Sequence, residues 1–444
     1  MTSKSLSELI DSDVLPKSWD RKRLDEIAYI NQKTSNLREY SSINYTDISS
    51  VGTRKVEIPS KIEIADAPSR ARRVLSKGDT VISTVRPNRK SFFYFAGEWE
   101  NAIASTGFAV VSPMHLEDSE YLHAMLTSEI AVRFYESICE GGAYPAFNPS
   151  RLAELVVPWP PKATRTELGK TVMDLQLKIE INNALSKTLE EIAQAIFKSW
   201  FIDFDPVKAK MAGETPEGMD AATATLFPDT MEESEMGLIP KGWRIGSLEE
   251  IVDLQGGYAF KSSSWKDFGV PVIKIGSVKP GYVDLTQVSY VDTSLAEGIS
   301  DDYRIPAGSL VVGLTGYVGQ VGLVRTHEPV PLVNQRVAKF KPRSGDWKIP
   351  FIYCFTRDPK FKVIVEELST GTAQQNVSNS QILSIPLVIP NNEIQKSFED
   401  SLTPLFNQII NLADENESLK SLRDALLPRL ISGELQIPEE MLAS

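Results

Sequence analysis

A basic stretch in the first half of the chain is the first candidate for chemistry. Between residues 70 and 90, seven cationic side chains stand against one acidic side chain, Asp79. The cationic set is Arg70, Arg72, Arg73, Lys77, Arg86, Arg89 and Lys90, with the polar Asn88 inside its last turn. Such a local excess of positive charge can neutralise the phosphates of a nucleic acid. From charge alone, a solvated loop face is the commoner interpretation.

The second half of the chain carries polar groups that could reach the edges of bases. Asn and Gln can pair with adenine through two hydrogen bonds, and Arg can pair with guanine in the same way. The candidates are Thr315, Tyr317, Gln320, Asn334, Gln335, Arg336, Gln374, Gln375 and Asn376. For each of them taken singly, a role in a turn or a helix cap is the more common alternative.

Catalytic sets for DNA chemistry are incomplete in this sequence. The segment 148–151 lacks the second proline and the aromatic residue that hold a flipped base in amino-methyltransferases. No Glu has a Lys two positions later, as the common nuclease metal site requires. Gly169-Lys170-Thr171 imitates the end of a phosphate loop, but Thr164 stands where that loop needs glycine. We therefore expect a non-catalytic chain, with a stand-alone DNA-modifying enzyme and a structural coiled-coil scaffold as the alternatives.

Composition limits the class of protein further. The 444 residues carry a net charge of −12, which argues against coating nucleic acid by bulk charge. Two cysteines and three histidines leave little for disulfides or a metal site, so no cofactor of the chain's own is expected. Neither a signal peptide nor an apolar run long enough for a membrane span is visible. A reducing cytoplasm is the expected location.

One long helix, expected over residues 165–202, must position these groups. Its apolar residues recur at steps of three and four, which lays them on one stripe that packs lengthwise on another helix. The stripe consists of Leu168, Val172, Leu175, Ile179, Leu189, Ile192 and Ile196. Thr164 with Glu167 has the pattern of a capping box, and Asn182 within the stripe is typical of a residue that fixes register.

The same stripe returns at a constant offset of 230 residues. The second copy consists of Phe398, Leu402, Leu405, Ile409, Leu419, Leu422 and Leu426. Pro404 lies inside it, so we expect the second helix to be secure only beyond that proline. The segments before each helix also match, which indicates a tandem duplication of a mixed α/β (α+β) head followed by a long helix.

The expected organisation has five parts. These are a first head (1–163), a helix (164–206), an acidic linker (207–238), a second head (239–390) and a C-terminal helix (391–444). The linker is rich in Gly, Pro, Thr and acidic residues, which predicts a connecting or docking loop and not a packed element.

Three segments resemble one known family. LEEIAQAIFKSWFIDFDPVKAKMAG (189–213) and LFPDTMEESEMGLIPKGW (226–243) resemble the central conserved region of specificity subunits of type I restriction–modification systems. SLKSLRDALLPRLISGEL (418–435) resembles the second conserved region of that family. The resemblance implies two target-recognition domains, each reading one half of a split double-stranded DNA sequence. It also implies that the two helices pair as an antiparallel coiled coil and bind methyltransferase subunits.

The resemblance further implies partners and their cofactors. Two methyltransferase subunits would supply S-adenosylmethionine for adenine methylation, and restriction subunits would supply ATP and Mg²⁺. The expected subunit-binding residues are Leu189, Ile192, Ile196, Phe197, Trp200, Phe201, Leu419, Leu422, Leu426 and Leu430. For the aromatic residues of this set, core or helix-end packing is the first alternative. The resemblance favours phosphate binding over a solvated face for the basic stretch at 70–90.

Overall fold

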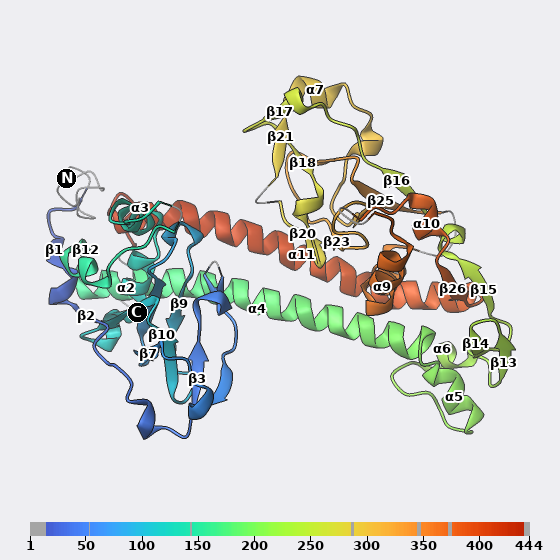
Figure 1. The fold of residues 1–444 in the computed structure, drawn as a ribbon, viewed down its shortest axis with the longest axis horizontal. Helices are drawn as coiled ribbons and strands as arrows, with labels where there is room; N and C mark the ends of the chain where they lie inside the picture. Colours follow the sequence, from blue (N-terminus) through green and yellow to red (C-terminus); the bar gives the residue numbers. More distant parts are fainter. Residues whose placement is uncertain are drawn as a thin grey trace. The chain divides into compact units, whose positions relative to one another are not determined.

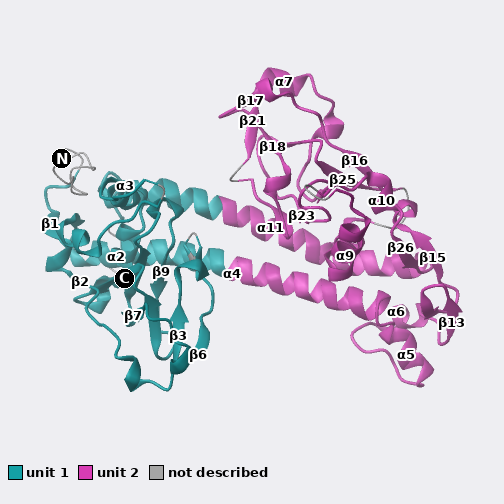
Figure 2. Cartoon of the chain, in the orientation of Figure 1, with its two compact units in different colours: residues 1–180, 418–444 teal, residues 181–417 magenta. Residues whose placement is uncertain are grey.

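The structure is a computed structural model that describes residues 15–52, 54–142, 144–285, 288–343, 348–371 and 375–438. Contacts divide the chain into two compact units (Figure 2). Unit 1 comprises residues 1–180 and 418–444, and unit 2 comprises residues 181–417. Two long helices, α4 (Lys162–Phe201) and α11 (Asn392–Ile431), contribute to both units (Figure 1). In each unit, a mixed α/β head packs on a part of both helices, as predicted.

The head of unit 1 is built mainly from two four-stranded sheets. Their strand orders are β6-β3-β10-β7 and β2-β11-β8-β9, and the pairs β1-β12 and β4-β5 complete the set. The strands are β1 (Asp20–Arg23), β2 (Ala28–Ile30), β3 (Ser42–Thr46), β4 (Val51–Gly52), β5 (Lys55–Val56), β6 (Ser60–Glu63), β7 (Ala71–Val74), β8 (Asp79–Ser83), β9 (Phe92–Phe95), β10 (Ala102–Ser105), β11 (Phe108–Pro113) and β12 (Val156–Trp159). Helices α2 (Ser119–Leu126) and α3 (Glu129–Ser137) follow β11. All of β8 is buried between its neighbours, as its apolar run and the turn at Gly78 predict.

The head of unit 2 follows a related plan with a larger sheet. A six-stranded sheet has the order β16-β25-β22-β23-β20-β19, beside a four-stranded sheet of order β17-β21-β18-β24 and the pairs β13-β14 and β15-β26. The strands are β13 (Met231–Ser234), β14 (Gly237–Pro240), β15 (Arg244–Ser247), β16 (Val252–Gly256), β17 (Trp265–Lys266), β18 (Val270–Ile273), β19 (Val278–Lys279), β20 (Gly281–Val283), β21 (Ser289–Val291), β22 (Leu310–Gly313), β23 (Val321–Leu323), β24 (Leu332–Val333), β25 (Val337–Pro342) and β26 (Pro386–Ile389). The helices are α5 (Asp205–Met211), α6 (Ala221–Leu226), α7 (Thr293–Glu297), α8 (Ile349–Arg357), α9 (Pro359–Leu368) and α10 (Asn379–Leu383).

The predicted duplication appears in the register of equivalent strands. In unit 1, β1 pairs antiparallel with β12 so that Asp20 faces Trp159. In unit 2, β15 pairs antiparallel with β26 so that Arg244 faces Ile389. These partners are shifted by 224 and 230 residues, the offsets at which the sequence segments match. The strand that enters each head therefore meets the strand that leaves it in one conserved register.

The two long helices pack antiparallel. In unit 1, Leu168 and Val172 near the start of α4 share a core cluster with Leu427 and Leu430 near the end of α11. In unit 2, a cluster of opposite composition joins the end of α4 to the start of α11, through Ala193, Phe197, Trp200, Phe201, Phe398, Leu402, Phe406 and Ile409. The predicted pairing of the helices is therefore confirmed within each unit.

A buried polar layer lies in the helix seam, where Asn182 was expected to fix register. The side chain of Asn182 is buried, and its Nδ2 donates to Asn416 Oδ1 at 3.0 Å and to Glu415 Oε2 at 2.8 Å. Asn416 Nδ2 in turn donates to Asn183 Oδ1 at 3.0 Å. A shift along the seam would leave these buried groups unpaired, so the layer favours this one register.

Three helix predictions need correction. Helix α4 begins at Lys162, so Thr164 is not its N-cap residue. Helix α11 runs through Pro404, which is exposed, so water can hydrate the carbonyl that loses its partner N–H. The stripe is also narrower than predicted: the equivalent residues Ile192 and Leu422 are 43% and 47% exposed, and Ala193 faces the seam in unit 2 instead.

The prediction that residues 207–238 form an unpacked linker is wrong. This segment contains most of α5, all of α6 and the β13-β14 hairpin. Val207 and Phe227 are buried in the core of unit 2, and Lys210 Nζ donates to the carbonyl of Ala224 at 3.3 Å. A few apolar anchors therefore pack the segment while its acidic side chains face outward, a pattern that overall composition conceals.

The heads dock on the long helices at equivalent positions through different contacts. In unit 1, a Cβ on Gly169 would lie 2.5 Å from the backbone nitrogen of Tyr121, so glycine allows α2 to touch the backbone of α4. In unit 2 the equivalent residue is Glu399, whose Oε1 accepts from the backbone N–H groups of Lys348 at 2.9 Å and Phe351 at 3.2 Å. Glu399 thereby caps the N-terminus of α8 from the neighbouring helix α11.

Gly169→Ala should destabilise the protein, although Ala is the better helix former. An alanine in a helix interior usually gains up to about 1 kcal/mol over glycine. Here the added methyl group meets backbone atoms that cannot rotate away, so we expect a net loss of about 1–3 kcal/mol in the free energy of unfolding. Urea unfolding would measure it, with the exposed neighbour Lys170→Ala as a control that changes little. A stabilised Gly169→Ala variant would show that α2 does not contact α4 this closely.

Glu399 should make stability decrease as pH rises. Burial raises the pKa of this carboxyl from 4.5 to about 7. The folded state then holds its proton more tightly than the unfolded chain, so the contribution of this group is largest below pH 4.5 and is lost by pH 7. Over that range the loss is on the order of 3 kcal/mol.

The variant Glu399→Gln keeps an acceptor oxygen and cannot ionise, so its unfolding free energy should depend less on pH between 4.5 and 7. Unfolding curves across that range provide the measurement. Glu393→Gln, an exposed change on the same helix, should keep the wild-type profile. Parallel profiles for wild type and Glu399→Gln would contradict the prediction.

Candidate DNA-recognition surface

In unit 1, two loops that hold predicted site residues are hydrogen-bonded to each other. We call residues 84–90 and 144–147 loop pair 1. The N–H of Arg86 donates to Pro145 O at 2.8 Å, and the N–H of Phe147 donates to Thr84 O at 3.0 Å. Two further hydrogen bonds between Glu140 and Ala146, of 2.8 and 3.0 Å, close the base of the second loop. The loops are therefore held by backbone contacts and do not depend on a ligand for their shape.

Unit 2 contains the same arrangement, which we call loop pair 2 (residues 314–320 and 375–377). The N–H of Gly316 donates to Gln375 O at 2.9 Å, and the N–H of Val377 donates to Leu314 O at 3.0 Å. Thr370 and Asn376 exchange hydrogen bonds of 2.8 and 2.9 Å at its base. Every donor and acceptor is shifted by 230 residues from its counterpart in loop pair 1. The duplication therefore extends to loops whose side chains differ.

The structure separates the predicted basic cluster of unit 1 into two regions. Arg86, Asn88, Arg89 and Lys90 lie in loop pair 1. Arg70 lies at the same end of the sheet, because its carbonyl accepts from Thr106 N–H while the carbonyl of the adjacent Gly107 accepts from Thr84 N–H.

Lys77 lies in the turn before β8, at the opposite end of that strand, so the expectation of one continuous basic edge is wrong for this residue. Arg72 is exposed on β7. Arg73 on the same strand is half-buried, and burial lowers the pKa of its guanidinium. Arg70, Arg72 and the loop residues are thus the members that face solvent near loop pair 1.

Two cations at loop pair 1 are bound within the protein. Lys90 Nζ forms an ion pair with Glu129 Oε1 at the start of α3. Arg54, which the sequence analysis missed, donates from Nη2 to Thr127 O at 2.9 Å and lies 3.8 Å from the same carboxylate. Burial, and then the nearby charge of Arg423, lower the pKa of Arg54 to about 10. These two side chains hold the loop against α3.

Loop pair 2 brings together several polar candidates of unit 2. Thr315 is half-buried, whereas Tyr317 (62% exposed), Gln375 and Asn376 lie open to solvent. The turn at residues 334–336 joins them, because Leu314 N–H donates to Arg336 O at 2.9 Å. Gln335 and Arg336 are exposed on that turn.

Two other candidates of unit 2 have bonds inside the protein, as the alternative reading allowed. The Nε2 of Gln320 donates to Val278 O, and Asn334 Oδ1 accepts from the N–H of Arg336 at 3.3 Å. Gln374 lies outside the described residues.

One exposed aromatic residue was missed by the sequence analysis. Tyr144 is 71% exposed, and the guanidinium carbon of Arg86 lies 4.3 Å from the centroid of its ring. The only sequence signal was the Gly141-Gly142 loop that precedes it, and this signal does not identify a partner.

The expected subunit-binding residues fall into three groups. Phe197, Trp200, Phe201 and Leu430 are buried in the cores of their units, so they support packing within this chain. Leu189, Ile196, Leu419 and Leu426 are half-buried. Ile192 and Leu422 are exposed, and in unit 2 the exposed Ile181 and Leu185 precede Ile192 on α4 at helical spacing. An apolar stripe of α4 therefore faces solvent in unit 2.

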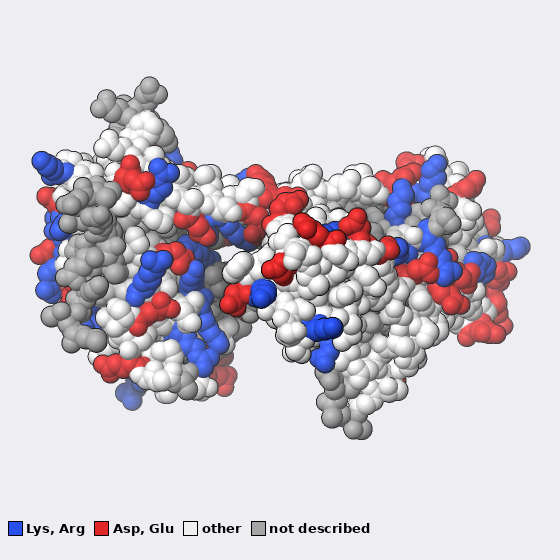
Figure 3. Space-filling view, turned by 90° about the horizontal axis from the view of Figure 1, so that it is seen from above, with Lys and Arg blue, Asp and Glu red and all other residues white. Residues whose placement is uncertain are grey.

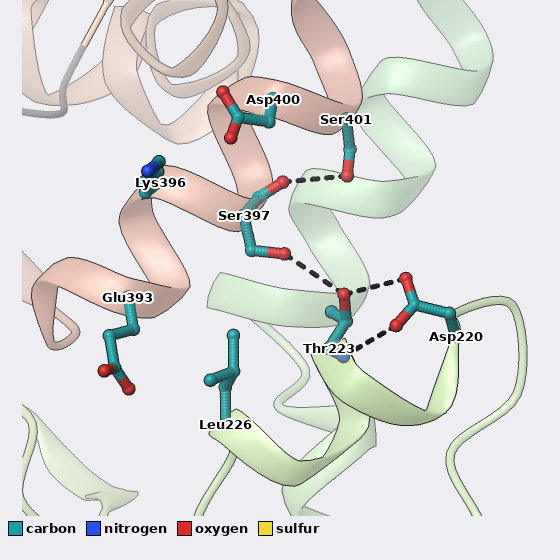
Figure 4. Close-up of a pocket in the computed structure, with 8 residues that line it drawn as sticks. All are labelled: Asp220, Thr223, Leu226, Glu393, Lys396, Ser397, Asp400 and Ser401. Carbon is teal, nitrogen blue, oxygen red and sulfur yellow. Dashed lines mark hydrogen bonds between the residues drawn. The ribbon is translucent and has the colours of Figure 1, made fainter.

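Surface grooves give no sign of catalysis among the described residues. Figure 4 shows a groove between α6 and α11 that is lined mainly by polar side chains. There Thr223 Oγ1 lies 3.2 Å from Ser397 Oγ and donates to Asp220 Oδ2 at 3.0 Å, with no histidine to act as a base. Within the described ranges, no group of three His, Cys, Asp or Glu side chains could hold a metal ion. The part of the chain that is described also has no helix long and apolar enough to cross a membrane.

The charges follow the same local logic. In the space-filling view, acidic and basic side chains alternate over both units, and no single sign covers the face shown (Figure 3). With a net charge of −12, attraction to DNA must come from small surfaces such as the loop pairs. Two similar heads with rigid, variable loops, carried by paired helices and without a catalytic set in the described residues, define a duplicated recognition protein.

Comparison with known sequences identifies the family. The chain matches the Type I restriction modification DNA specificity domain twice, over residues 16–191 and 240–421, and it belongs to this family. It is a non-catalytic specificity subunit of a type I restriction–modification system, and its function is recognition of a DNA target.

Relatives match along almost the whole chain. The Type I restriction enzyme HindI specificity subunit of Haemophilus influenzae is 27% identical, over 94% of this chain and 99% of that protein. The MjaIX specificity subunit of Methanocaldococcus jannaschii is 24% identical, over 98% of each. The crystal structure of a type I restriction–modification S subunit from M. genitalium shares the fold, with a TM-score of 0.52 at 14% identity, covering 97% of this chain and 98% of that one.

Binding to DNA should depend on salt through the exposed arginines near loop pair 1. Each lost phosphate contact lowers the slope of log K against log salt concentration by about 0.9. Replacing Arg70 and Arg89 by Gln should therefore lower the slope by about 2, as measured by fluorescence anisotropy with duplex DNA. Lys77→Gln, at the other end of β8, is the matched control and should leave the slope unchanged. An equal effect of all three changes would return the cluster to a general charge effect.

Proposed function

We propose that this subunit reads a bipartite DNA target, one half-site with each unit, through its two loop pairs. The observation that carries the proposal is the same hydrogen-bonded loop pair in both units with different side chains. A shared backbone places both loop pairs in the same way on their heads, and the side chains then determine which bases each prefers. Partner subunits carry out adenine methylation or restriction at the site so chosen.

The proposed reading side chains follow from exposure. In unit 1 they are Arg70, Arg72, Arg86, Asn88 and Arg89, with Lys90 as a support. In unit 2 they are Thr315, Tyr317, Gln335, Arg336, Gln375 and Asn376. Within each set, basic groups outside the loop tips contact phosphates and fix the position of the head, while polar groups at the loops contact base edges.

The proposed domain boundaries place the target-recognition domains at residues 1–163 and 239–390. The helices at 164–206 and 391–444 support them. Because residues 207–238 pack on unit 2, this connection belongs structurally to the second head.

The proposed partners are two methyltransferase subunits and, for restriction, restriction subunits in the cytoplasm. The exposed apolar stripe of Ile181, Leu185 and Ile192, together with Leu422, offers area for their helices. S-adenosylmethionine, ATP and Mg²⁺ are assigned to those partners, which bring the catalytic groups.

Exchange of one head tests the proposal. Replacing residues 239–390 by the equivalent segment of a relative with another target should change one half of the methylated sequence and leave the other half as it was. Mapping of methylated adenines in host DNA gives the result, and a strain without the chain gives the background. Exchange of residues 1–163 is the matched experiment and should change the opposite half. A change of both halves by one exchange would contradict independent reading by the two units.

A further inference from the structure

Backbone strain is concentrated at loop pair 1. Among the described non-glycine residues, six have positive φ, and two of these are asparagines, which tolerate that conformation. Three of the remaining four are Arg54, Arg86 and Lys90, with φ of 53°, 49° and 55°. These three belong to one structure, since Arg54 N–H donates to Lys90 O at 3.0 Å and Arg86 begins the turn that Lys90 ends. Strained basic residues persist where the surrounding contacts hold them, and they are typical of functional sites.

The contacts divide the labour among these residues. Lys90 pairs with Glu129, and Arg54 is buried against Thr127 O and the ring of Phe92. Both therefore fix the loop from below. Arg86 instead has its guanidinium over the exposed ring of Tyr144, while its own N–H is bound by Pro145 O. The ring and the backbone bond together restrict where the planar guanidinium can point.

We propose that Arg86, stacked on Tyr144, reads a guanine in the half-site bound by unit 1. This inference rests on the proposed function, because it requires loop pair 1 to face a DNA groove. A guanidinium presents two parallel N–H groups that match O6 and N7 of guanine, and this is the commonest specific contact of arginine in the major groove. Stacking on Tyr144 orients the guanidinium before DNA arrives, so less side-chain freedom is lost on binding.

Unit 2 has no counterpart at this position. The residue equivalent to Arg86 is Gly316, with φ of 78°, which keeps the backbone shape of the loop without a side chain. Its neighbour Tyr317 is exposed on the first loop, whereas Tyr144 stands on the second loop of unit 1. The guanine contact is therefore a property of one half-site and distinguishes the two otherwise similar heads.

Base analogues test the proposal in the assembled methyltransferase complex, once its recognition sequence has been mapped. Binding is measured by fluorescence anisotropy for the natural duplex and for duplexes in which each guanine of the unit 1 half-site is replaced by 7-deazaguanine, which lacks N7. For the wild-type protein, one such replacement should weaken binding about tenfold. For Arg86→Ala and Arg86→Lys, the same replacement should have no further effect, because the bidentate contact is already lost. Tyr144→Phe should keep the wild-type response, since the ring remains, and Tyr144→Ala should reduce it.

The controls separate this inference from the proposed function. Arg21→Ala removes an exposed arginine on β1, away from the loop pair, and should respond as wild type does. If Arg86→Ala weakens binding to all sequences equally and lowers the salt slope by about 0.9, Arg86 contacts a phosphate and the inference is overturned, while the bipartite proposal stands. A wild-type protein that is insensitive to every 7-deazaguanine in that half-site also overturns it. Failure of the bipartite proposal would appear instead in head exchange, as a change in both halves.

Discussion

The packing of α4 against α11 is the interaction on which the rest of the structure depends. Neither head could bury its apolar face alone, because the core of each includes residues from both helices, such as Leu168 and Leu427 in unit 1 and Phe197 and Phe398 in unit 2. The seam is mainly apolar, which gives strength but little choice of register. The buried layer of Asn182, Asn183 and Asn416 supplies that choice, because any other register would strand buried amides without partners.

The duplication shows which features of a head must be kept and which can vary. The backbone hydrogen bonds of the loop pairs and of the entering and leaving strands recur at constant offsets. The attachment to the helix does not: Gly169 lets two backbones touch in unit 1, while Glu399 caps a helix in unit 2. Both solutions place a helix of the head, α2 or α8, against the seam. The position is therefore under a geometric constraint, and several side-chain chemistries satisfy it.

Recognition of DNA by an acidic chain follows from this division. The scaffold carries the negative charge, and positive or amide side chains are gathered on short loops where few of them suffice to orient a head. Rigid loops suit this task, since a side chain that is already oriented loses less entropy when it binds a base. The ion pair of Lys90 with Glu129 illustrates the same point, because it uses a cation for loop support that charge counting would assign to phosphate.

The sequence by itself determined the duplication, the two long helices, their antiparallel pairing and the family, because these depend on periodicity and on long matching segments. Asn182 could be assigned to the seam for the same reason, as a polar residue in an apolar repeat. Tertiary structure alone decided the rest. It showed that Val207 and Phe227 anchor a segment whose composition resembles a linker, and that exposure allows α11 to continue through Pro404. It also brought Arg54, Arg86 and Tyr144 together from three separate segments. Sequence patterns report contacts between near neighbours on one element, whereas contacts between loops depend on strand order and register, which no local pattern encodes.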